Sequence, residues 1–305
     1  MKYLLLFIAC LFITNAFSNK IDLLKSDKDV ADFIISLDSM FTRKHAQRFI
    51  VPTDSAIVQC SPMAKTAKIH NWEKTDFNND GATDLLVIGN WYDYKPYVVI
   101  DIGNNQFKLI ELGYSSFNNC ELAKIITINK RPMLVFYVKK TYLDRTSKKI
   151  ADYKDSTEID TLAYQFNSFI EYNPHITKKK IKSITFKTGT CFGTCPEFSI
   201  TVLANGKAIY SGGSFDKRDG QYSALIPRVD LQPIYDIIDY IDLKKIKNNY
   251  AVTWTDSPTC SLMINFKDGS VKNIEDYGEL GTFGLRAVYD HFFQIHAKQY
   301  WEKAN

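Results

Sequence analysis

Residues Asp76-Phe-Asn-Asn-Asp-Gly-Ala-Thr-Asp84 combine residue types in a spacing that could bind a metal ion. Oxygen-bearing side chains recur at every second position, and a glycine follows them. Ca²⁺ takes about six to eight oxygen ligands at about 2.3 to 2.6 Å, and a short loop supplies them only where it turns sharply, as Gly81 allows here. The predicted calcium ligands are Asp76, Asn78, Asp80, the backbone carbonyl of Ala82, and Asp84.

The loop is not an EF-hand. An EF-hand needs glutamate at position twelve as a bidentate ligand, and Val87 stands there. The stretch resembles instead the calcium loop of the FG-GAP and VCBS repeats, in which Asp-x-Asn/Asp-x-Asp-Gly-x-x-Asp enters a strand. That resemblance implies a propeller, but the chain has a single copy, so we expect a lone repeat-like hairpin within a different sheet. The alternative is an Asx-turn without metal, and a site would have a Kd of about 0.1 to 1 mM.

Five cysteines follow the N-terminal segment, and they could pair in an oxidising compartment. We predict that Cys60 pairs with Cys120, because they are the two in the first half of the chain. We predict that Cys191 pairs with Cys195, because Gly193 permits a tight reversal between them. Cys260 would then stay reduced. A bond between Cys260 and one of the pair Cys191 and Cys195 is the competing arrangement.

The second half of the chain carries a further motif around its cysteines. Cys191-Phe-Gly-Thr-Cys195-Pro is followed by an Asn205-Gly206 hairpin signal and later by Thr255-Asp256-Ser257-Pro258. Together these segments resemble an uncharacterised domain of exported bacterial proteins with a Cys-Phe-Gly-x-Cys-Pro motif, over about residues 178–301. The resemblance implies antiparallel strands with two helices and implies no function. Cys260 departs from the family pattern, which agrees with an unpaired thiol.

The first eighteen residues predict export. Lys2 precedes an apolar run that ends in small residues near Ser18, as in a secretory signal peptide. We expect cleavage after Ser18 rather than lipidation at Cys10, and a secreted or periplasmic protein without a transmembrane segment. Removal of this segment, which contains one lysine, changes the formal charge from +4 to +3. So mild a balance predicts no nucleic-acid partner.

The remaining length and patterning predict an α+β fold with two β-rich domains, built of antiparallel sheets and a few packed helices. The domains are residues 19–175, which hold the calcium-type loop, and residues 181–305, which hold the Cys-x-x-x-Cys loop. A helix capped by Ser26 or Asp27 is expected, because apolar residues recur after it at intervals of three and four. Further helices are expected over 230–241 and over 285–301, and a single strand is expected over 161–172. Lys178, Lys179 and Lys180 would form a solvated linker between the two domains.

Two function classes remain open. The leading hypothesis is an exported non-catalytic module for recognition or envelope structure, with another envelope or extracellular protein as a partner. The alternative is an extracytoplasmic enzyme, either a thiol-disulfide protein using Cys191 and Cys195, or a hydrolase whose carboxylates, such as Asp216 and Asp256, meet only in the fold. The sequence has no Gly-x-Ser-x-Gly, P-loop or His-x-x-x-His motif.

Overall fold

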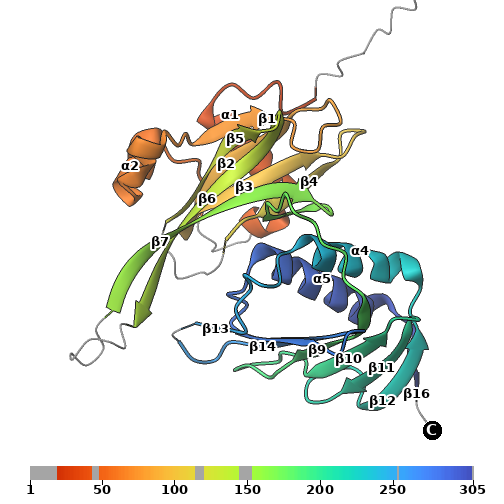
Figure 1. Cartoon of the computed structure of the whole chain (residues 1–305). Helices are drawn as coiled ribbons and strands as arrows, with labels where there is room; N and C mark the ends of the chain where they lie inside the picture. Colours follow the sequence, from red (N-terminus) through yellow and green to blue (C-terminus); the bar gives the residue numbers. More distant parts are fainter. Residues whose placement is uncertain (1–18, 43–47, 114–119, 144–152, 253, 304–305) are drawn as a thin grey trace, which may run out of the picture.

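The computed structural model describes residues 19–42, 48–113, 120–143, 153–252 and 254–303, so the predicted signal segment and Cys10 lie outside the described residues. The protein has the predicted α+β, β-rich fold, with antiparallel sheets and a few helices. The first half contains two four-stranded sheets, and the second half contains one eight-stranded sheet covered by two helices (Figure 1).

The first sheet has the strand order β1-β2-β3-β4 and is antiparallel throughout. Its strands are β1 (Trp72–Thr75), β2 (Asp84–Trp91), β3 (Asp93–Asp101) and β4 (Phe107–Glu111). The apolar run of β2 is buried on both faces, since Leu86 packs toward the second sheet while Leu85 and Val87 pack toward α1. This sheet is therefore the central layer of the first half.

Helix α1 (Asp27–Leu37) covers the outer face of that sheet. Ser26 and Asp29 form a reciprocal capping box at its start, which satisfies two backbone N–H groups that the helix leaves unpaired. Val30 and Ile34 are fully buried against the sheet. Three short helices follow α1: η1 (Ser39–Thr42), α2 (Asp54–Cys60) and α3 (Met63–Ala67).

The second sheet has the order β5-β6-β7-β8 and is also an antiparallel meander. Its strands are β5 (Glu121–Ile128), β6 (Arg131–Leu143), β7 (Tyr153–Gln165) and β8 (Ser168–Glu171). Leu134 and Phe136 of β6 are fully buried and share a core with Leu86 and Val98 of the first sheet. The two meanders therefore pack face to face.

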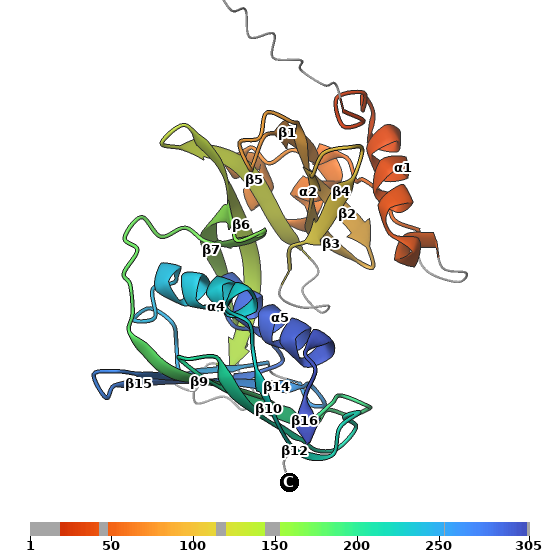
Figure 2. The ribbon, with the colours of Figure 1, turned by 90° about the vertical axis from the view of Figure 1, so that its right-hand side faces the viewer.

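The second half is built on a sheet of order β13-β15-β14-β9-β10-β11-β12-β16, in which only the β13–β15 pair is parallel among the described strands. These strands are β9 (Ile181–Thr188), β10 (Phe198–Leu203), β11 (Lys207–Gly212), β12 (Gly220–Leu225), β13 (Asn249–Ala251), β14 (Thr259–Phe266), β15 (Val271–Tyr277) and β16 (Glu302–Lys303). Helices α4 (Arg228–Tyr240) and α5 (Phe283–Lys298) lie on the face of this sheet that is turned toward the first half (Figure 2).

The two halves share buried contacts. The carboxylate of Glu171, at the end of β8, accepts hydrogen bonds from the backbone N–H groups of Phe283 and Gly284 at the start of α5, the latter at 2.9 Å. Phe283 also enters the core between the two four-stranded sheets, where its ring lies 5.1 Å from that of Phe136. The first turn of α5 is therefore fixed by the first half of the chain.

Two local expectations were wrong. Residues 161–172 form two strands instead of one, with a turn at Phe166 and Asn167, both at positive φ. Lys179 does not belong to a purely solvated linker, because its ammonium donates to the carbonyl of Ile238 at 2.7 Å and so satisfies the end of α4. Burial lowers the pKa of Lys179.

Candidate functional site

The calcium-type loop connects β1 to β2, at one end of the first sheet. Asp76 receives hydrogen bonds from the loop backbone, at 3.2 Å from the Asp80 N–H and at 2.9 Å from the Gly81 N–H. Gly81 adopts a φ of 89°, in the left-handed region that favours glycine. The sharp turn expected from the sequence is thus present, and the Asp76 carboxylate closes it.

Asp76, Asn78 and Asp80 lie together in this loop. The amide of Asn78 donates to the Asp80 carboxylate at 2.8 Å, and its oxygen accepts from the Asp80 N–H at 3.1 Å. The second Asp80 oxygen accepts from the Ala82 N–H at 2.8 Å. Three of the five predicted ligands are therefore neighbours, and the chain passes through Ala82 to the third carboxylate of the set, Asp84.

Asp84 begins β2 and is fully buried. Its carboxylate accepts from the Phe77 N–H at 2.7 Å and from the Asp101 N–H at 2.8 Å, so it ties the loop to β3. Burial raises the pKa of Asp84 to about 7, and the negative charges of Asp76 and Asp80 contribute to the rise. The loop therefore concentrates carboxyl groups that repel one another.

The donor set fits a hard cation by its chemistry. Among the described residues, no lysine or arginine forms an ion pair with Asp76, Asp80 or Asp84. In that same part of the chain, no three His, Cys, Asp or Glu side chains are grouped as metal ligands are. The loop carboxylates accept backbone hydrogen bonds instead, as in an Asx-turn. Calcium binding stays a prediction that requires these oxygens to turn toward a common point.

Two cysteine pairs lie within bridging distance. Cys60, at the end of α2, and Cys120, just before β5, have Cα atoms 5.9 Å apart, and their sulfurs are joined. Cys191 and Cys195 are joined in the β9–β10 loop with Cα atoms 5.6 Å apart. Gly193 between them has a φ of 146°. The structure thus contains the two disulfides that the sequence suggested.

Cys260 is the free cysteine of the described residues and is buried on the inner face of β14. Its thiol lies 3.7 Å from a Glu279 oxygen. Burial raises the pKa of Cys260, and the charges of Glu279 and Asp276 raise it further. A thiol that resists ionisation in this way is a poor nucleophile.

The two carboxylates considered for a hydrolase do not meet. Asp216 lies in the β11–β12 loop and pairs with His296 of α5, whose Nε2 is 3.2 Å from Oδ1. Asp256 precedes β14, and its carboxylate accepts from the Thr255 hydroxyl. Strands β14 and β11 are separated by β9 and β10, which amounts to roughly 14 Å at ordinary strand spacing. Sequence reasoning missed the Asp216–His296 pair, because no local spacing connects residues 80 positions apart.

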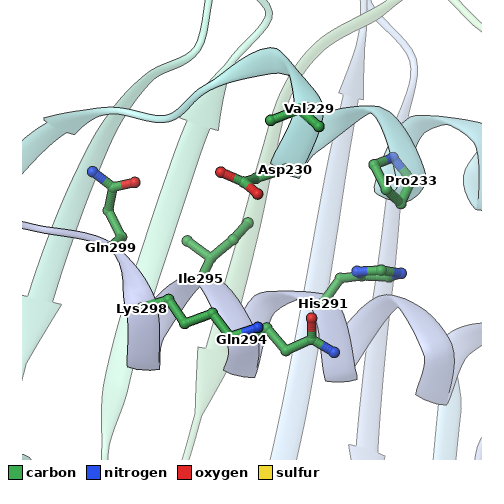
Figure 3. A pocket seen from close by; sticks show the side chains of 8 residues that line it. All are labelled: Val229, Asp230, Pro233, His291, Gln294, Ile295, Lys298 and Gln299. Atoms are coloured by element: carbon green, nitrogen blue, oxygen red, sulfur yellow. The ribbon is translucent and has the colours of Figure 1, made fainter. Parts of the chain in front are cut away.

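A small pocket of about 200 Å³ lies between α4 and α5. Figure 3 shows Val229 and Asp230 of α4 facing Ile295 and His291 of α5 across it. Burial lowers the pKa of His291, and the nearby Lys108 lowers it further. No hydrogen bond connects His291 to a carboxylate among the described residues. Asp230 and His291, which both line the pocket, are therefore not hydrogen-bonded to each other.

No helix among the described residues is long and apolar enough to cross a membrane.

Comparison with known proteins finds a similarity for part of the second half. No curated protein matches the chain. The model of DUF6438, a domain of unknown function, matches residues 182–296, which extend from β9 into the last turns of α5. Residues 182–296 are therefore similar to this domain of unknown function.

Proposed function

We propose that the protein is an exported, non-catalytic recognition module whose first half is stabilised by Ca²⁺. The ion would be held by Asp76, Asn78, Asp80, the Ala82 carbonyl and Asp84. The observation that carries the proposal is that Asp76, Asn78 and Asp80 are joined by hydrogen bonds in one loop, which leads into the buried Asp84. A dication would neutralise the charges of Asp76 and Asp80, whose repulsion adds to the effect of burial on the pKa of Asp84.

The position of the loop supports the resemblance to FG-GAP and VCBS repeats. It joins the first two strands of a four-stranded antiparallel meander, and a second meander packs on the first. The first meander cannot bury its two apolar faces alone, so the second sheet covers one of them and α1 covers the other. Two stacked units in place of a closed ring would explain why one loop is enough.

Export is supported by the N-terminal segment and by the two disulfides, which persist in oxidising compartments. A non-catalytic role is supported by the state of the groups an enzyme would use. The Cys191–Cys195 pair is closed, Cys260 is buried with a raised pKa, and Asp216 and Asp256 lie in separate loops. Another envelope or extracellular molecule is the expected partner.

Thermal unfolding with and without calcium tests the proposal. Calcium binds the folded loop and not the unfolded chain, so the melting temperature should rise on addition of 10 mM CaCl₂ to the chelated protein. The Asp80→Ala variant should lose that rise, while Asp268→Ala, which removes an exposed turn carboxylate elsewhere, should keep it. Identical melting of the wild type in calcium and in chelator would contradict the proposal.

A further inference from the structure

A second and larger cavity, of about 900 Å³, lies where the two halves of the chain meet. Turns of the first half line it at residues 77–79, 128–133 and 163–167, and Tyr172 and Tyr240 complete its wall. Tyr240 is the last residue of α4. The volume lies within the range of about 300 to 1,000 Å³ that is common for ligand clefts. We refer to it as the turn cleft.

The lining of the turn cleft is rich in polar and aromatic side chains. Five of its residues carry side-chain amides, five are aromatic, two are cations, and none is Asp or Glu. An amide both donates and accepts, so neighbouring amides can bind the hydroxyl groups of one sugar. Phe77 and Tyr240 are buried, whereas Tyr164, Phe166 and Tyr172 are partly exposed. A partly exposed aromatic ring presents a flat apolar face that suits the C–H face of a pyranose. With few aliphatic side chains, the cleft does not offer the apolar pockets that anchor a peptide.

The two cations come from one tight turn. Asn129 and Lys130 connect β5 to β6 and have φ values of 52° and 63°. Such turns favour glycine and asparagine, because the left-handed conformation brings the Cβ of other residues close to the backbone. The turn directs Lys130 and the adjacent Arg131 to the cleft.

The opposite turn shows the same feature. Phe166 and Asn167 connect β7 to β8 with φ values of 53° and 60°. The Phe166 ring packs edge-on against Tyr240, with ring centres 5.7 Å apart at 79°. A large aromatic residue in this conformation is unusual. The contact fixes the end of α4 as a wall of the cleft.

Lys130 and Arg131 are exposed, and neither forms an ion pair within the described ranges of the chain. A guanidinium can hold a carboxylate by two parallel hydrogen bonds, and an adjacent ammonium adds attraction. With no acidic residue in the lining, both charges remain available to a ligand. The cleft therefore favours an anion that also carries hydroxyl groups.

We propose that the turn cleft binds an acidic oligosaccharide, with Lys130 and Arg131 holding sugar carboxylates and the cleft amides and rings holding the pyranoses. The inference rests on the proposed recognition role and gives it a ligand class, and its charge contacts come from Lys130 and Arg131, which are not among the proposed calcium ligands. Asn78 and Asn79 of the calcium-type loop also line the cleft, so the two sites are neighbours.

The test is a titration of the full chain with a hexameric oligogalacturonate, in which calorimetry measures the heat of binding. We expect binding that weakens with salt, as for exposed charge contacts. Two control ligands should each bind at least about tenfold more weakly than oligogalacturonate. Maltohexaose has the same number of pyranoses without carboxylates, and polyglutamate has carboxylates without sugar. The Lys130→Glu/Arg131→Glu variant should lose about tenfold or more in affinity.

The matched control is Lys187→Glu/Lys217→Glu, which makes the same charge change at exposed residues outside the cleft. Its affinity for oligogalacturonate should equal that of the wild type, and circular dichroism should show both variants folded. Absence of wild-type binding, equal loss in the two variants, or equal binding of polyglutamate would overturn the proposal. The calcium role is judged separately, since Asp80→Ala removes the calcium-dependent melting shift whether or not the sugar binds.

Discussion

The pH dependence of unfolding in calcium-free buffer should be dominated in the first half by Asp84. Its carboxyl is fully buried and has a pKa raised from 3.8 to about 7. Because the folded pKa lies above the unfolded value, the folded state holds the proton more tightly between about pH 4 and 7. The stabilisation is complete below about pH 4 and is lost as the pH rises through 7. A shift of about 3 pKa units corresponds to about 4 kcal/mol.

Calcium should offset this loss at high pH. A bound dication favours the ionised carboxylate, so it stabilises the folded state where Asp84 is charged. With a Kd of about 0.1 to 1 mM, 10 mM Ca²⁺ adds about 1.4 to 2.7 kcal/mol to the free energy of unfolding at pH 8. At pH 4, where the carboxyl is protonated, the same calcium should add close to nothing.

The assay is urea unfolding followed by tryptophan fluorescence from pH 4 to 8, with and without calcium, on wild type and on Asp84→Asn. Burial also raises the pKa of Asp276 and Glu171, so they give a pH slope of the same sign. The Asp84→Asn variant keeps those groups, so the difference between its pH slope and that of the wild type isolates the contribution of Asp84. Loss of one acceptor for the Phe77 and Asp101 N–H groups costs about 1 to 3 kcal/mol at every pH, without adding slope. Equal slopes in the two proteins would refute the reasoning.

Three further predictions concern stability and thiol chemistry. In urea unfolding, the Cys60→Ser/Cys120→Ser variant should lose about 4 kcal/mol of unfolding free energy and the Cys191→Ser/Cys195→Ser variant about 2 kcal/mol. The first bridge closes a sequence separation of 60 residues and the second a separation of 4. Equal losses would contradict this dependence on ring size. In the chain without residues 1–18, iodoacetamide should label one thiol, Cys260, only after denaturation, since burial raises its pKa. Rapid labelling of the native protein, detected by mass spectrometry, would contradict this prediction. Glu171→Ala should cost about 2 to 4 kcal/mol by leaving the Phe283 and Gly284 N–H groups unpaired, whereas unchanged melting would show that this contact between the halves is dispensable.

Much of the fold follows from short-range signals in the sequence. Ser26 and the apolar spacing after it predict α1, and Asn205-Gly206 predicts the β10–β11 hairpin. The β7–β8 turn could not be predicted in this way, because Phe166 and Asn167 include no glycine and the alternation continues through them. Helices α2 and α3 are too short to show periodicity, and α2 is fixed by the Thr53 cap and the packing of Ile57.

The candidate sites could also be predicted from the sequence only in part. Asp76, Asn78 and Asp80 occupy alternate positions of one short loop, so their spacing alone predicts their grouping. The hydrogen bond from the Asp101 N–H to Asp84 depends on the pairing of β2 with β3 and has no sequence signal. Lys130 and Arg131 are neighbours in the sequence, but the cleft that they line forms only where turns of the first half meet the end of α4. Their role can therefore be inferred only from the structure.

Direct titration of the chelated protein with CaCl₂ by isothermal calorimetry tests the central claim of a calcium-stabilised first half. The wild type should bind one equivalent with a Kd of about 0.1 to 1 mM at pH 7.5, and Asp80→Ala should give no binding heat while remaining folded by circular dichroism. Absence of binding in the wild type, or equal binding in Asp80→Ala, would show that residues 76–84 form a turn closed by side-chain hydrogen bonds and not a metal site.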